Sequence, residues 1–222
     1  MGVVTAITVQ ARNPDRVNVL VDGAYRFSLD VLQVGDLGVK IGTDYSEQQL
    51  QAFERESEYG KLYARALEYC LSRPHSHAEV RDYLRRKTRP VLGKDGQLRP
   101  GVSQQNADRV LERLVERGYI DDAAFARYWV ENRRQAKGAS RRRLEMELRQ
   151  KGVASQLIAD ALGATERSDV DELQKVIAKR RTRYADEQKL VAYLARQGFA
   201  YDDIKAALRR ESAQAEEQSE TD

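Results

Sequence analysis

The chain has 222 residues, of which 41% are hydrophobic and 33% are charged, and its formal net charge is +3 at pH 7. No apolar run is long enough to cross a bilayer and no signal peptide is evident, so we expect neither a membrane-embedded nor a secreted protein. The single cysteine, Cys70, excludes an internal disulfide, which makes a reducing cytoplasm the expected location.

The charges are unevenly distributed along the chain. Residues 61–210 contain 33 of the 38 basic and 21 of the 35 acidic side chains, whereas residues 211–222 contain five acidic side chains and no basic one. A cationic surplus of this kind favours an anionic polymer or an acidic protein groove as binding partner.

Residues 1–45 predict a small antiparallel sheet. Val3–Val9 and Val17–Val21 are rich in β-branched residues, and Asp22-Gly23 is a strong signal for a two-residue hairpin. A sheet this small is marginal alone, so we expect it to pack on the first helices or to serve as an accessory contact. The glycine-rich residues 35–42 lack the Gly-Lys-Ser/Thr ending of a nucleotide loop and predict a connecting turn.

The pattern becomes helical from residue 46. A charged connecting helix is predicted within residues 46–60, and a second helix over 61–72 presents Cys70 on its apolar face. Pro74 ends that helix, and residues 89–105 predict a loop because they contain two prolines and three glycines.

A capping box, Ser76-x2-Glu79, starts the next helix. His75 and His77 flank this box. Two histidines alone cannot assemble a metal site, so we expect surface or capping roles for them and no bound metal.

Three glycines mark predicted helix ends. Each follows a leucine by four residues and precedes a large apolar residue, which is the spacing of a Schellman motif with a left-handed glycine. The leucine and the apolar residue should then contact each other. The three sets are Leu114, Gly118 and Tyr119; Leu148, Gly152 and Val153; and Leu194, Gly198 and Phe199.

The apolar pattern around these glycines repeats, and residues 190–208 match residues 144–162 with a displacement of 46. Each helix pair needs a third helix or a neighbouring unit to bury its apolar stripe. We therefore predict a mainly α-helical fold of tandem three-helix repeats in an extended curved array. The predicted segments are a β-rich extension (1–45), a connecting helix (46–60), three repeats (61–117 with the 89–105 insertion, 118–163 and 169–210) and a disordered acidic tail (211–222).

These motifs resemble those of the RecX regulatory proteins. The resemblance covers about residues 3–210 and is carried by Ser76-x2-Glu79, Gly118-Tyr119-Ile120-Asp121-Asp122, Lys151-Gly152-Val153 and Gly198-Phe199. It implies tandem three-helix repeats that bind the RecA recombinase, lodge in the groove of its filament on single-stranded DNA, and restrain its ATPase and strand exchange. It supplies no catalytic residue and no cofactor, and we expect a monomer that is not an enzyme.

Four basic clusters lie at comparable places in successive repeats. One cluster alone is usually a solvated helix face, but the repeated placement predicts a stripe that contacts acidic filament surface, the DNA backbone, or both. Several weak contacts on one scaffold combine by avidity. The candidate residues are Arg85, Arg86 and Lys87; Arg133, Arg134 and Lys137; Arg141, Arg142, Arg143, Arg149 and Lys151; and Lys179, Arg180, Arg181 and Arg183.

The aromatic residues of the middle repeat permit two interpretations. Aromatic side chains can stack on bases of a single strand, but Phe125 and Trp129 are four residues apart and should share the core face of one helix. Tyr128 is then the best candidate for an exposed contact. Tyr119 is expected to pack at its glycine turn.

Two alternatives remain from the sequence. Residues 140–162 could be a helix-turn-helix that reads duplex DNA, although the second helix offers only Gln156 as a good base-reading side chain. Within the RecA interpretation, groove binding and capping of a filament end need the same cationic face, so the sequence does not choose between them.

Overall fold

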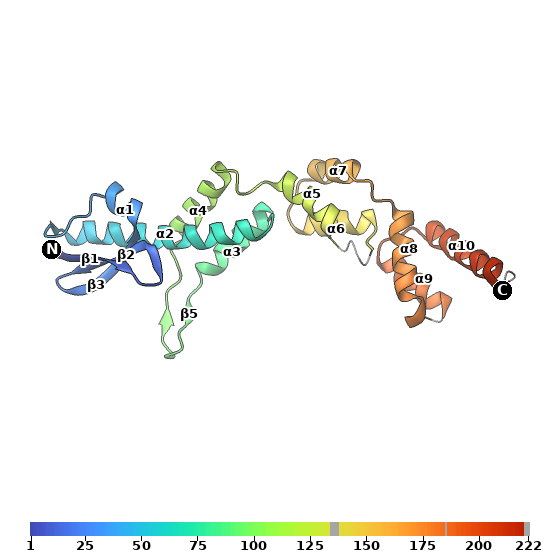
Figure 1. Ribbon diagram of the computed structural model, residues 1–222, viewed down its shortest axis with the longest axis horizontal. Coiled ribbons are helices and arrows are strands. Elements are labelled where there is room, and N and C mark those ends of the chain that lie inside the picture. The colour runs from blue at the N-terminus through green and yellow to red at the C-terminus, as the bar shows by residue number, and fades with distance from the viewer. Residues whose placement is uncertain (134–137, 185, 220–222) are drawn as a thin grey trace. The chain divides into compact units, whose positions relative to one another are not determined.

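The computed structural model describes residues 1–133, 138–184 and 186–219, which form ten α-helices and six strands (Figure 1). They divide into two compact units. The first unit contains residues 1–73 and 80–120, and the second contains residues 74–79 and the chain from residue 121 onward. The predicted mainly helical fold with a small N-terminal sheet is confirmed. None of the described helices combines the length and apolar character needed to span a membrane.

The N-terminal sheet has four antiparallel strands in the order β3-β2-β1-β4. Asp22 and Gly23 connect β2 to β3 with φ angles of 50° and 79°. Two positive φ angles in a two-residue turn match the twist of a hairpin, so the predicted Asp-Gly turn is confirmed. The strands are β1 (Gly2–Gln10), β2 (Asn13–Val21), β3 (Ala24–Asp30) and β4 (Asp44–Tyr45).

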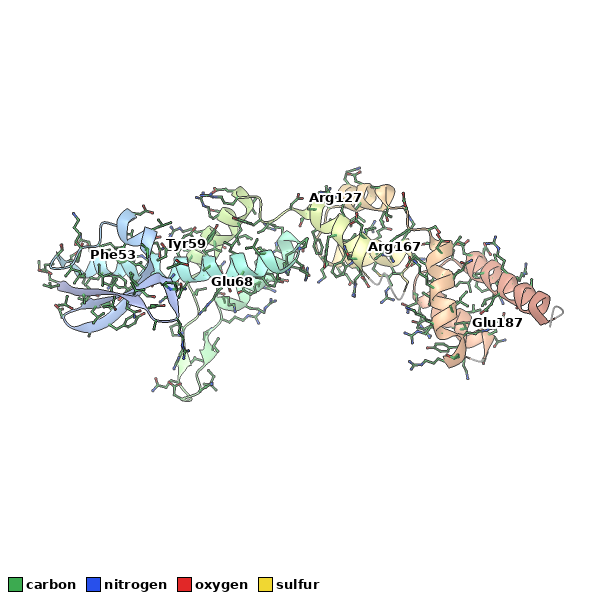
Figure 2. The ribbon with its side chains drawn as sticks, viewed as in Figure 1. Phe53, Tyr59, Glu68, Arg127, Arg167 and Glu187 are labelled. Carbon is green, nitrogen blue, oxygen red and sulfur yellow. The ribbon has the colours of Figure 1, made fainter. Side chains whose placement is uncertain are left out.

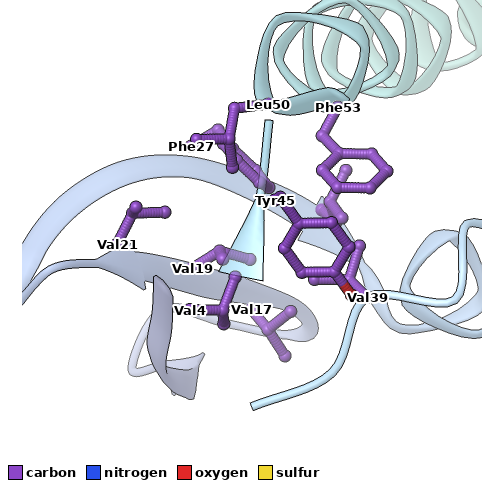
Figure 3. Close-up of a cluster of buried hydrophobic side chains, with 10 residues drawn as sticks. Val4, Val17, Val19, Val21, Phe27, Val39, Tyr45, Leu50 and Phe53 are labelled. Carbon is purple, nitrogen blue, oxygen red and sulfur yellow. The ribbon is translucent and has the colours of Figure 1, made fainter. Parts of the chain in front are cut away.

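One face of the sheet packs on helix α2 (Glu47–Ser72). Val19 and Phe27 from the strands meet Leu50 and Phe53 from the helix in a buried cluster (Figure 3). The sequence did not predict the short helix α1 (Val31–Asp36), which begins with a capping box formed by Asp30 and Gln33. The prediction of two separate helices between residues 46 and 72 is wrong, because α2 is continuous through Gly60.

The first three-helix cluster combines the second half of α2 with α3 (His77–Lys87) and α4 (Gln104–Glu116). It lies in the first unit, except for residues 77–79 of α3, which belong to the second. Its core includes Leu62, Cys70, Leu84 and Leu114, so the structural role predicted for Cys70 is confirmed. The predicted loop 89–105 is partly wrong. It contains a hairpin of β5 (Val91–Leu92) and β6 (Leu98–Arg99), and Ser103 already caps α4.

The second unit holds two further three-helix clusters, each with its own core. The predicted disordered tail is wrong for residues 211–219, which continue the last helix; alanine, glutamate and glutamine there favour helix. Residues 220–222 lie outside the described part. The helices are α5 (Asp122–Asn132), α6 (Arg141–Gln150) and α7 (Ser155–Ala164), then α8 (Asp169–Arg180), the 3-10 turn η1 (Arg181–Arg183), α9 (Glu187–Arg196) and α10 (Tyr201–Ser219).

All three predicted Schellman motifs are present. Gly118, Gly152 and Gly198 have φ angles of 72°, 76° and 93°. In each motif the residue after the glycine donates its N–H to the carbonyl of the predicted leucine, at 3.0, 3.2 and 3.4 Å. Val153 and Phe199 are buried as expected. Tyr119 is 40% exposed, so the prediction that it packs at its glycine turn is wrong, and the next residue, Ile120, is buried in the core instead.

At two of these turns, the hydroxyl of a serine at the start of an earlier helix donates a hydrogen bond to a backbone carbonyl. Ser140 Oγ donates to the carbonyl of Gln197 at 2.8 Å, and Ser76 Oγ donates to the carbonyl of Lys151 at 2.8 Å. The N–H after each serine donates to an aspartate at the start of α8 or α5, at 2.7 Å in both cases. These contacts all lie within the second unit. The same pair of hydrogen bonds therefore links each of these two helix starts to a glycine turn and to the start of another helix.

A buried ion pair joins the two clusters of the second unit. Glu172 on α8 is only 2% exposed and accepts hydrogen bonds from Arg167 at 2.6 Å, Lys175 at 2.8 Å and the Ala139 N–H at 3.0 Å. Arg167 lies between α7 and α8 (Figure 2) and also donates to the carbonyl of Val130, at the end of α5, at 2.6 Å. Burial alone would raise the pKa of Glu172, but the hydrogen bonds from Lys175 and Arg167 outweigh it and hold the pKa below its ordinary value.

The lowered pKa of Glu172 predicts acid destabilisation of the second unit. A carboxylate with a depressed folded-state pKa stabilises the fold above the unfolded-state pKa, about 4.3 for glutamate. That contribution is lost as the pH falls from there through the folded-state pKa. Urea unfolding at a series of pH values, followed by the fluorescence of Trp129, measures the loss. The free energy of unfolding of the Glu172→Gln variant should depend less steeply on pH in this range than that of the unaltered protein. Equal slopes would contradict the prediction.

Candidate functional site

The middle basic cluster is largely engaged within the second unit. Arg141 donates to the carbonyl of Leu162 at 2.5 Å, and Arg143 binds Glu147 at 3.2 Å and the amide oxygen of Gln197 at 2.7 Å. These two side chains stabilise the fold, because their guanidinium groups donate hydrogen bonds to helix ends and to neighbouring helices. Only Arg142 of this triplet is exposed.

The neighbours of this triplet are also paired. Lys151 binds Glu79 at 2.5 Å, and Arg133 binds Glu147 at 3.0 Å. Arg149 forms an exposed pair with Glu145 at 2.6 Å. The predicted members Arg134 and Lys137 lie outside the described residues.

The basic cluster at the end of α8 is mixed. Arg181 lies 3.6 Å from a carboxylate oxygen of Glu211, and Arg180 lies 5.5 Å from the ring centroid of Tyr193. Lys179 and Arg183 are exposed and have no ion pair among the described residues. The structure therefore distinguishes cations that support the fold from cations available to a partner.

The first unit brings several basic side chains to one open groove with a volume of about 510 Å³. Two of them, Arg86 and Lys87, belong to a predicted cluster; the third member, Arg85, is paired with Asp82 at 3.1 Å. The groove lies between α2, the end of α3 and the base of the β5–β6 hairpin. Its basic lining residues are Lys61, Arg65, Arg86, Lys87 and Arg89.

The charge of this groove is strongly one-sided. None of its five basic side chains forms an ion pair with a described residue. The one acid in the lining, Glu58, accepts hydrogen bonds from the Ser103 N–H at 3.0 Å, the Ser103 hydroxyl at 2.8 Å and the Asn106 amide at 2.7 Å. These donors are neutral, so Glu58 keeps its negative charge, but five basic side chains outnumber it and the groove presents a net positive charge that attracts an anionic group.

The hairpin is fixed firmly at its base. The Val102 N–H donates to the carbonyl of Lys87 at 2.9 Å. Gly101 passes so close to Thr88 that a Cβ there would lie 2.3 Å from the Thr88 carbonyl carbon. The apolar side chains of Leu62, Val91 and Val102 complete the groove lining.

Sequence reasoning missed Lys61, Arg65 and Arg89 as site residues. Lys61 and Arg65 are four residues apart on α2, which places them on one helix face. Only the packing of α3 on α2, with the Tyr83 hydroxyl donating to the carbonyl of Arg65 at 3.4 Å, brings them beside Arg86. No local pattern in the sequence reports this contact.

The aromatic residues of the second unit serve mainly as core. Phe125 is fully buried, and its ring centroid lies 5.5 Å from that of Trp129, which confirms the predicted core face. Tyr128 is half-buried and so less exposed than predicted. In the would-be recognition helix, Gln156 donates to Asp160 at 2.9 Å, so its amide is engaged within α7.

Other expected features can be placed as well. His75 is buried and contacts a carboxylate oxygen of Glu79 at 3.2 Å, so a surface role is wrong for it. Within the described residues, no group of three or more histidine, cysteine, aspartate or glutamate side chains is arranged to hold a metal ion.

Comparison with known proteins assigns the family. Residues 2–44 match the model of the regulatory protein RecX N-terminal domain, and residues 121–162 and 169–208 match those of the second and third three-helix domains of RecX. The chain is 30% identical over 216 residues to the regulatory protein RecX of Bacillus licheniformis, covering 94% of this chain and 77% of that protein. The chain belongs to the RecX family.

Other RecX proteins support the same assignment. The regulatory protein RecX of Halalkalibacterium halodurans is 29% identical, covering 99% of this chain and 82% of its own. A crystal structure of regulatory protein RecX shares the fold with a TM-score of 0.67 at 23% identity, covering 93% of this chain and all of that one. The structure of RecX from Lactobacillus salivarius has a TM-score of 0.51 at 21% identity and covers 69% of this chain.

Proposed function

We propose that the protein binds the RecA recombinase and the RecA filament on single-stranded DNA, and that it restrains RecA ATPase, strand exchange and filament growth. Membership of the RecX family of regulatory proteins carries this proposal. The cationic surplus of residues 61–210 supports it, because the proposed partner is a nucleoprotein polymer. The protein acts by binding, without a catalytic residue or cofactor, as a cytoplasmic monomer.

The proposed mechanism is occupancy of the filament groove. The protein lies where a second DNA strand would enter and bridges neighbouring RecA protomers, which hinders the motions coupled to ATP hydrolysis. Several moderate contacts on tandem repeats give avidity on a repeating polymer. Among the residues predicted as contacts, we retain those that are exposed and lack an ion pair among described residues: Arg86, Lys87, Arg142, Lys179 and Arg183.

A titration of RecA ATPase tests this function and its mode. On pre-formed RecA filaments, we expect the rate to fall progressively and to require a near-stoichiometric amount of the protein. Strongly substoichiometric inhibition that leaves filament interiors unaffected would instead indicate capping of filament ends. An unchanged ATPase rate at saturating protein would overturn the proposed function.

A further inference from the structure

The groove of the first unit differs from the other basic regions in being both concave and unneutralised. Its five cations come from α2, from the end of α3 and from Arg89, which lies between α3 and β5, and no described carboxylate pairs with any of them. In the second unit, by contrast, Arg141 and Arg143 at the start of α6 bind carbonyl, amide and carboxylate oxygens. Five basic side chains left without anions mark a surface that a ligand neutralises.

The lining favours a phosphodiester chain over an acidic peptide. Three of the five cations are arginines, whose planar guanidinium groups bind two oxygens of a phosphate or of a carboxylate at once, so they do not distinguish these ligands. What favours nucleic acid is the apolar wall of Val91, Pro100 and Val102, against which sugars and bases can pack. A positively charged groove with an apolar or aromatic surface is the usual design of sites for single-stranded nucleic acid.

The hairpin forms one side of the groove, which is open to solvent. Val91 is 63% exposed although it lies on β5, and Figure 1 shows the hairpin projecting from the helices of the first unit. The backbone contacts at Thr88 and Gly101 hold the base of this arm in place. The groove is therefore open to an extended ligand lying between the helices and the hairpin.

We propose that this groove binds the phosphodiester backbone of single-stranded DNA, with Lys61, Arg65, Arg86, Lys87 and Arg89 neutralising successive phosphates and the base of the β5–β6 hairpin forming the apolar wall. The inference deepens the proposed function, on which the choice of single-stranded DNA rests. It assigns the DNA contact to the first unit and adds Lys61, Arg65 and Arg89, which lie outside the predicted stripe, to Arg86 and Lys87.

Fluorescence anisotropy of a labelled oligothymidylate with the full chain, without RecA, tests the assignment. The triple variant Lys61→Gln, Arg86→Gln and Arg89→Gln should bind at least about tenfold more weakly and should show a shallower dependence of affinity on salt. Each phosphate contact to a single strand contributes about 0.7 to the slope of log affinity against log salt, so the slope should decrease by about two.

The matched control removes the same number of positive charges from the same unit, but outside the groove. Arg12, Lys40 and Arg117 are exposed, lie outside the groove lining, and form no ion pair with a described residue. The triple variant Arg12→Gln, Lys40→Gln and Arg117→Gln should keep most of the affinity and slope. Equal losses in both variants, or no binding by the unaltered chain, would overturn the site. Circular dichroism and thermal unfolding establish that both variants are folded.

Competitors identify the ligand class. Unlabelled oligothymidylate should displace the probe at lower concentration than polyglutamate of matched charge or duplex DNA. Displacement by polyglutamate at equal concentration would assign the groove to an acidic protein, and equal displacement by duplex would remove the single-strand preference; either result overturns the inference. Loss of DNA binding in the groove variant alone would support the site even if the RecA ATPase test fails.

Discussion

The Glu172→Gln variant is expected to lose about 3–5 kcal/mol of stability in the second unit, because removal of one partner leaves the other charge buried and uncompensated. Arg167 is that partner: its side chain is only 12% exposed beside Glu172 and donates to the carbonyl of Val130. Glutamine keeps the shape and one acceptor for the Ala139 N–H, so the loss reports the charge. Urea unfolding followed by the single tryptophan, Trp129, measures it in the correct unit.

The matched control is Glu145→Gln. Glu145 also pairs with an arginine at 2.6 Å in the second unit, but its side chain is 40% exposed and that of Arg149 is 61% exposed. An exposed pair contributes at most about 1 kcal/mol. If both variants lost the same stability, burial would not be the cause. In the double variant Arg167→Met and Glu172→Gln, we expect a loss smaller than the sum of the single losses.

Gly198→Ala is expected to destabilise the chain by about 2–5 kcal/mol. A left-handed alanine costs about 1–2 kcal/mol, and the added Cβ would lie 2.5 Å from Ser140 Oγ. That hydroxyl cannot move freely, because it donates to the carbonyl of Gln197 and accepts from the Arg143 N–H at 3.1 Å. Overpacking of this kind adds about 1–3 kcal/mol. Thermal unfolding measures the total.

Gly118→Ala measures the cost of the left-handed backbone conformation alone. Gly118 has the same Schellman geometry, but no described atom lies within 4 Å of its would-be Cβ. This variant should lose only the left-handed term, about 1–2 kcal/mol. Adding Ser140→Gly to Gly198→Ala should recover part of the loss, since glycine is tolerated at a helix N-cap. Equal losses at Gly118 and Gly198 would show that the serine contact is unimportant.

Local signals in the sequence predicted local structure well. The spacing of leucine, glycine and an apolar residue predicted three Schellman turns, because a left-handed helix end requires only neighbouring residues. The Asp22-Gly23 hairpin was predictable for the same reason. The exposure of Tyr119 was not predictable, because Ile120 competes for the same core position and only tertiary packing decides between them.

The candidate site depended on contacts that the sequence does not display. A run such as Arg141-Arg142-Arg143 looks uniformly available, yet tertiary packing places Arg141 and Arg143 against carbonyl, amide and carboxylate oxygens and leaves Arg142 exposed. Conversely, the sequence did not single out Lys61 and Arg65, because only the packing of α3 on α2 brings them to the groove. The predicted extended curved array stays a prediction.

The most direct test of the RecA interpretation is retention of the protein by immobilised RecA, measured with and without single-stranded DNA and ATP. The protein should be retained most strongly when all three are present, and more strongly than by the same DNA without RecA. Retention that depends on the DNA alone and is unchanged by RecA would contradict the account.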